Sequence, residues 1–134
     1  MSPSILRRKR LPPELVGAAD AFAAVLEELE PAKVALTEVL PGTRAPGRPL
    51  PEALATFTAG LGRARDRMPG WRVEPVAAEW TACETGIEAS LAAAERAATF
   101  APAGFESLLW LVEELLDPLE PFAEAERAFR ALRR

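Results

Sequence analysis

The sequence predicts an all-α protein, an antiparallel four-helix bundle, from its composition, its apolar spacing and the placement of its prolines. Alanine supplies 27 of the 134 residues, and leucine, glutamate and arginine are also abundant, all of which favour helix. Isoleucine, a β-branched residue, occurs only at Ile5 and Ile87. The length suits one domain with its own core. We expect a helical domain over residues 13–134, preceded by a flexible basic arm at residues 1–12.

Prolines are placed where helices should begin or end. Pro13, Pro51 and Pro75 suit the first turn of a helix, where the missing N–H group is not needed. Pro-Gly pairs at 41–42 and 69–70 indicate helix ends. The predicted helices cover about residues 13–40, 51–68, 74–98 and 103–133.

Apolar residues recur every three or four positions within each predicted helix. In the last helix the series includes Phe105, Leu108, Val112 and Leu115. This spacing is typical of helices that pack side by side. Prolines interrupt the pattern in two helices, Pro31 in the first, and Pro118 and Pro121 in the last. We therefore expect kinks in the first and last helices, with a kink or full break near Asp117.

The composition removes most side chains that perform chemistry at neutral pH. The chain has no histidine, tyrosine, asparagine or glutamine, and its single cysteine is Cys83. Neither an imidazole base nor a carboxamide that could read nucleic-acid bases is available. Cys83 lies on the predicted apolar face, which favours a buried, inert thiol. We expect no catalytic residues and no cofactor.

The chain carries no apolar run long enough to span a bilayer. The basic stretch Arg7–Arg10 could begin a signal peptide, but Pro12, Pro13 and Glu14 interrupt the apolar region that should follow. One cysteine cannot form an internal disulfide. These features predict a soluble, cytoplasmic protein, and the bias towards arginine over lysine suggests a bacterial, GC-rich source.

Carboxylates offer the one catalytic arrangement that needs no histidine, an Mg²⁺ or Mn²⁺ site. The pairs Glu27 with Glu30 and Glu114 with Asp117 have the spacing E-x-x-E and E-x-x-D. These pairs resemble the metal motifs of the all-α nucleoside-triphosphate pyrophosphohydrolases. In that family the motifs lie close in sequence, whereas more than eighty residues separate them here. The resemblance implies a third alternative function, Mg-dependent nucleotide hydrolysis.

Cations should gather at one end of the predicted bundle. In an up-down-up-down arrangement, the chain start, the second-to-third connection and the chain end meet at one pole. Twelve of the sixteen cations fall there. A positive pole could attract nonspecific nucleic acid or an acidic membrane surface. Anion binding is therefore the second alternative, with the candidate residues Arg63, Arg67, Arg72, Arg130 and Arg134.

The last predicted helix has more apolar surface than a small bundle can bury. Residues 108–112 are five consecutive apolar residues, so they point in every direction around a helix. An exposed tryptophan in such a patch is typical of a protein–protein contact. We expect a non-enzymatic interaction or adaptor module, self-associating as a homodimer or binding another protein. Its predicted contact residues are Phe105, Leu109, Trp110 and Leu111.

Overall fold

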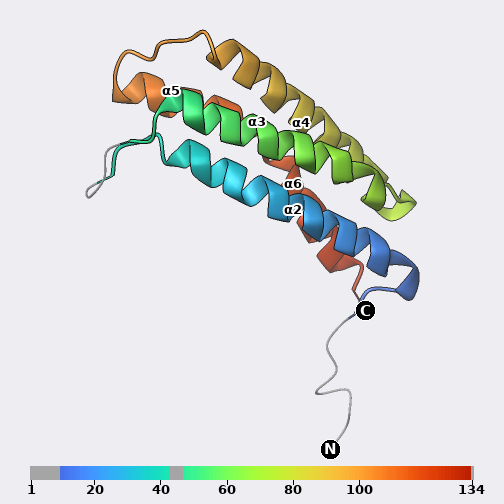
Figure 1. Cartoon of the computed structure of the whole chain (residues 1–134). Coiled ribbons are helices and arrows are strands. Elements are labelled where there is room, and N and C mark those ends of the chain that lie inside the picture. The colour runs from blue at the N-terminus through green and yellow to red at the C-terminus, as the bar shows by residue number, and fades with distance from the viewer. Residues whose placement is uncertain (1–9, 43–46, 134) are drawn as a thin grey trace, which may run out of the picture.

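The structure, a computed structural model, describes residues 10–42 and 47–133. It is an antiparallel helical bundle with four helical segments, the fourth in two pieces (Figure 1). The first three segments contain α2 (Val16–Thr37), α3 (Leu50–Arg67) and α4 (Ala77–Ala97). The fourth contains α5 (Phe105–Leu116) and α6 (Pro121–Ala131). Short 3-10 turns flank or join them: η1 (Pro13–Leu15), η2 (Met68–Trp71), η3 (Glu74–Val76) and η4 (Asp117–Leu119).

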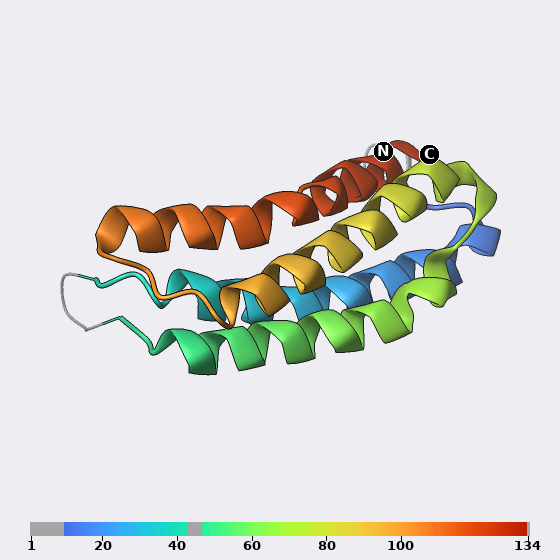
Figure 2. The ribbon, with the colours of Figure 1, turned by 90° about the horizontal axis from the view of Figure 1, so that it is seen from above.

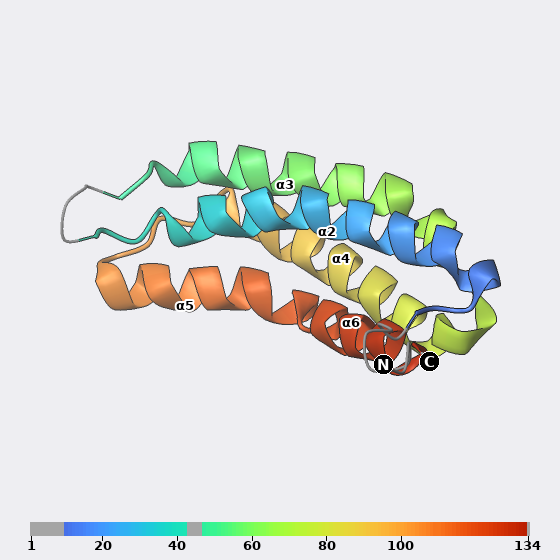
Figure 3. The same cartoon turned by 90° about the horizontal axis from the view of Figure 1, so that it is seen from below.

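The antiparallel order gives the bundle two different ends. The start of α2, the η2–η3 connection and the end of α6 meet at one end (Figures 2 and 3). The end of α2, the start of α3 and the connection from α4 to α5 lie at the other. Arg63, Arg67, Arg72 and Arg130 therefore belong to the first end, which we call the arginine end.

Helices α2 and α3 pack closely together. A Cβ atom added to Gly60 would lie only 2.6 Å from the Cβ of Ala32, so these helices approach as closely as a glycine allows. At the arginine end, the rings of Phe22, Trp71, Phe122 and Phe129 form one cluster that joins α2, η2 and α6. The rings of Phe22 and Trp71 meet edge to face with centroids 4.8 Å apart, and Phe129 packs against both.

The predicted bundle and its four segments are confirmed. Local rules explain the agreement, because prolines occupy the first turn of η1, α3 and η3 as expected. Around Pro118 the α-helix gives way to η4, so regular helix is interrupted where the Asp-Pro pair predicts it. By contrast, α2 continues through Pro31, and a kink at that residue remains a prediction.

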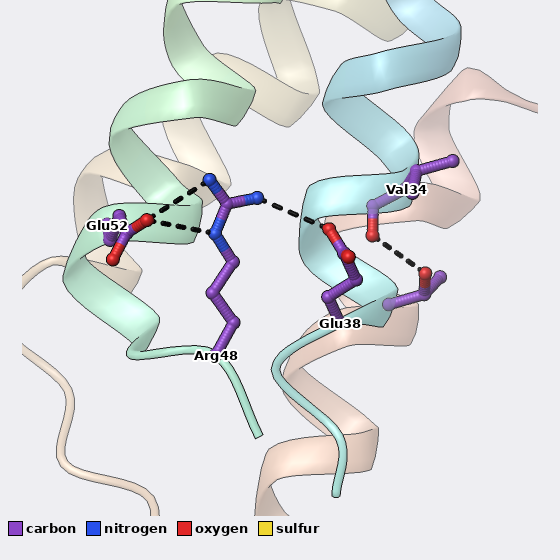
Figure 4. Close-up of polar contacts among 5 residues, drawn as sticks. Val34, Glu38, Arg48 and Glu52 are labelled. Atoms are coloured by element: carbon purple, nitrogen blue, oxygen red, sulfur yellow. Dashed lines mark hydrogen bonds and ion pairs between the residues drawn. The ribbon is translucent and has the colours of Figure 1, made fainter. Parts of the chain in front are cut away.

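The connection from α2 to α3 is held by one arginine. The Arg48 guanidinium contacts Glu38, just after α2, at 3.3 Å and Glu52, in the first turn of α3, at 3.2 Å (Figure 4). The backbone N–H of Arg48 also donates to the carbonyl of Glu38 at 2.7 Å. These contacts link the end of α2 to the start of α3.

Among the described residues, no helix is both long enough and apolar enough to cross a membrane. Most of the predicted basic arm, residues 1–9, lies outside the described part of the chain.

Candidate functional site

Helix α5 carries the most exposed large apolar side chains of the described structure. The exposed fraction is 59% for Trp110 and 53% for Phe105. Leu109, between them in sequence, is half-buried. We call these three residues, Phe105, Leu109 and Trp110, the α5 surface.

The α5 surface wraps around the outer side of the helix. Five residues correspond to about 140° of rotation, so Phe105 and Trp110 project on different sides, with Leu109 between them. The opposite stripe of the helix holds the buried Leu111, Val112 and Leu115. Leu111, which the sequence placed with the contact residues, is only 4% exposed and belongs to the core.

Carboxylates surround Trp110. Its neighbours one turn away on the helix are Glu106, Glu113 and Glu114, at positions i−4, i+3 and i+4. Glu106 and Glu113 are exposed, and Glu114 is half-buried. The twelve residues of α5 include no lysine or arginine. The α5 surface is therefore an apolar projection with an acidic rim.

Two of the candidate arginines share one carboxylate. Arg63 donates from Nε to Glu28 at 2.7 Å, and the Nε of Arg67 lies 3.5 Å from the other oxygen of Glu28. The hydrogen bond from Arg63 and the charges of both arginines lower the pKa of Glu28, against the opposing effect of burial. Glu28 lies on α2, so this contact ties α3 to α2 and partly neutralises the two cations.

The other described candidates also have partners within the chain. The Arg72 guanidinium lies over the Trp80 ring, 4.6 Å from its centroid, and Arg130 contacts Glu126 at 3.2 Å. Arg134 lies outside the described residues. The four described candidate arginines thus all make intramolecular contacts, which reduces the charge that they offer to an external anion.

The candidate metal ligands are not assembled into a site. Glu27, Glu30 and Asp117 are exposed and Glu114 is half-buried. In the described part of the chain, no three carboxylates or thiols come close enough together to hold an ion. The two halves of the E-x-x-E and E-x-x-D pattern therefore do not converge in this structure.

Cys83 is fully buried in α4. Burial, with the nearby charge of Glu79, raises the pKa of its thiol to about 12. The thiolate needed for nucleophilic attack is therefore scarce at neutral pH.

A feature that the sequence did not indicate is an apolar groove between α2 and α6 at the arginine end, with a volume of about 410 Å³. Buried Phe22 and Phe129 line it, with ring centroids 5.0 Å apart. Arg130, Arg133 and Glu126 contribute its charged groups. The groove combines side chains from the first and last segments, so no local pattern could reveal it. We call it the α2–α6 groove.

Charge distinguishes the α2–α6 groove from three other surface grooves of the described residues. Each of those has more carboxylates than cations in its lining. The α2–α6 groove has two arginines and one glutamate. It is therefore the groove among the four that suits a partner with an apolar centre and acidic edges.

No protein-family model, curated protein or solved structure matches this chain.

Proposed function

We propose that this protein is a non-enzymatic helical interaction module that self-associates through the α5 surface. The observation that carries the proposal is the 59% exposure of Trp110 on a helix whose opposite stripe is already buried. Aromatic side chains bury roughly 150–250 Å² each and dominate the energetics of interfaces. Trp110 and Phe105, buried against a partner, would therefore form the centre of the interface.

Charge favours a second copy as the partner. The acidic rim of Trp110 needs an apolar surface edged with cations. Each copy of the chain carries such a surface at its arginine end. We further propose that the protein works in the cytoplasm, because Cys83 is a buried free thiol rather than half of a disulfide.

Light scattering over a range of protein concentrations tests the proposal, together with acrylamide quenching of tryptophan fluorescence. Trp71 and Trp80 are 0% and 6% exposed, so quenching in the dilute protein reports chiefly on Trp110. We expect the mass to rise with concentration and the quenching to fall in parallel. Trp110→Ala should weaken association about tenfold or more, which corresponds to a contact at the centre of an interface.

Phe100→Ala is a matched control, because Phe100 is an aromatic residue of 45% exposure that lies before α5 rather than in it. This variant should associate like the wild type. A wild-type protein that stays monomeric at high concentration, with Trp110 quenched equally throughout, would overturn the proposal.

A further inference from the structure

On the premise of the proposed self-association, we propose that Trp110 of one copy docks into the α2–α6 groove of the next, which makes the contact head-to-tail. The two surfaces are complementary in both apolarity and charge. Trp110 lies between Glu106 and Glu113 along α5. The groove has an apolar lining that includes the mostly buried rings of Phe22 and Phe129, and its charged groups are Arg130, Arg133 and Glu126. An indole beside guanidinium groups also gains a cation–π contact.

A symmetric contact between two α5 helices is disfavoured by charge. In that arrangement the carboxylates around one Trp110 would face the carboxylates around the other, because α5 contains three glutamates and no cation. Like charges brought together in an interface cost free energy unless cations intervene. The α2–α6 groove supplies Arg133 together with Arg130, which also contacts Glu126, whereas a second α5 supplies no cation.

A single chain cannot make this contact with itself. Trp110 and Arg130 are twenty residues apart on the fourth segment, roughly 30 Å at the helical rise per residue. The start of α5 and the end of α6 lie at opposite ends of the bundle (Figure 3). The projection on one copy must therefore meet the groove of another. When two copies join in this way, one copy keeps a free α2–α6 groove and the other keeps a free Trp110. Further copies can therefore add, and the contact builds rings or chains rather than a closed two-fold dimer.

Mixing two complementary variants tests this arrangement. Trp110→Ala removes the projection, and Arg130→Glu with Arg133→Glu inverts the charge of the groove. We expect each variant alone to be monomeric in sedimentation velocity at concentrations where the wild type assembles. An equimolar mixture should form heterodimers and stop there, because each pair retains one working projection and one working groove.

Charge reversal on both surfaces provides the second measurement. Glu106→Arg with Glu113→Arg should abolish assembly of the otherwise wild-type chain and restore it in the chain that carries Arg130→Glu and Arg133→Glu. Arg65→Glu with Arg96→Glu is a matched control, since it makes the same charge change outside the groove. Circular dichroism and thermal melting verify that every variant is folded.

The outcomes separate this inference from the function on which it rests. Assembly of Arg130→Glu with Arg133→Glu at wild-type strength would overturn the groove contact while leaving self-association intact. Heterodimers that fail to form in the mixture, with all variants folded, would also overturn it. A wild-type protein that never assembles would instead remove the proposed function itself.

Discussion

The Ser90 hydroxyl on α4 donates a hydrogen bond to the backbone carbonyl of Leu115, near the end of α5, at 2.9 Å. Ser90 is fully buried, the one buried polar side chain among the described residues. The bond lies beside the point where Pro118, which has no N–H group, ends regular helix. A side chain from another helix thus supplies a donor to backbone at the interruption of the fourth segment.

Replacing Ser90 should destabilise the fold more than the loss of one oxygen atom from an exposed position would. Ser90→Ala leaves the Leu115 carbonyl buried without this donor, and we expect the free energy of unfolding to fall by about 1–3 kcal/mol. Urea unfolding followed by circular dichroism measures the change. Thr81→Ala is the control, because its hydroxyl makes the same kind of bond, to the Ala77 carbonyl at 3.1 Å, but in an exposed position. Equal losses of free energy of unfolding in the two variants would show that the buried hydrogen bond stabilises the protein no more than the exposed one.

Gly86, one turn before Ser90 on α4, allows the backbone at Pro118 to approach this helix closely. A Cβ atom at this position would lie 2.1 Å from the carbonyl oxygen of Pro118. That atom is backbone and cannot rotate away. We expect Gly86→Ala to lower the free energy of unfolding by roughly 3 kcal/mol, towards the upper end of the overpacking range.

Gly62→Ala is the matched test of this explanation. Gly62 is also inside a helix, α3, but an added Cβ would meet no other atom within 4 Å. Alanine should therefore stabilise the protein by about 0.5–1 kcal/mol through helix propensity. Opposite signs for the two substitutions, measured by urea unfolding, support the close approach at Pro118. A Gly86→Ala protein as stable as the wild type would contradict it.

The fold could be predicted because its main signals are local. The first helical turn at Pro51, the interruption near Pro118 and the apolar spacing all depend on residues within one or two turns. The α3 helix spans Leu50–Arg67, against a predicted 51–68.

Details of the candidate site depend on contacts that are distant in sequence. Five consecutive apolar residues do not reveal which side of α5 faces the core, so Leu111 could not be separated from Trp110 by its spacing. Arg63 was recognised as a cation, but its partner Glu28 is 35 residues away on another helix. The α2–α6 groove exists only because the first and last segments meet.

The buried thiol of Cys83 should make the free energy of unfolding depend on pH in the alkaline range. The ordinary pKa of the thiol is 9.0, and burial raises it to about 12 in the folded protein. Between these values the unfolded chain loses the thiol proton while the folded chain keeps it, so unfolding becomes easier as the pH rises. The stabilisation is fully present below pH 9 and is lost progressively towards pH 12, at about 1.4 kcal/mol per pH unit within the window.

The variant Cys83→Ala isolates this effect, because alanine does not titrate. The cavity that the substitution leaves should lower the free energy of unfolding by the same amount at every pH. The change of that free energy with pH should therefore differ between the two proteins only above pH 9. Urea unfolding at intervals from pH 7 to 11 measures both profiles. Above pH 9 the free energy of unfolding should fall more steeply for the wild type than for the variant. The difference between the two free energies should therefore become smaller as the pH rises. Parallel profiles across that range would mean that the thiol ionises as readily in the folded protein as in the unfolded chain.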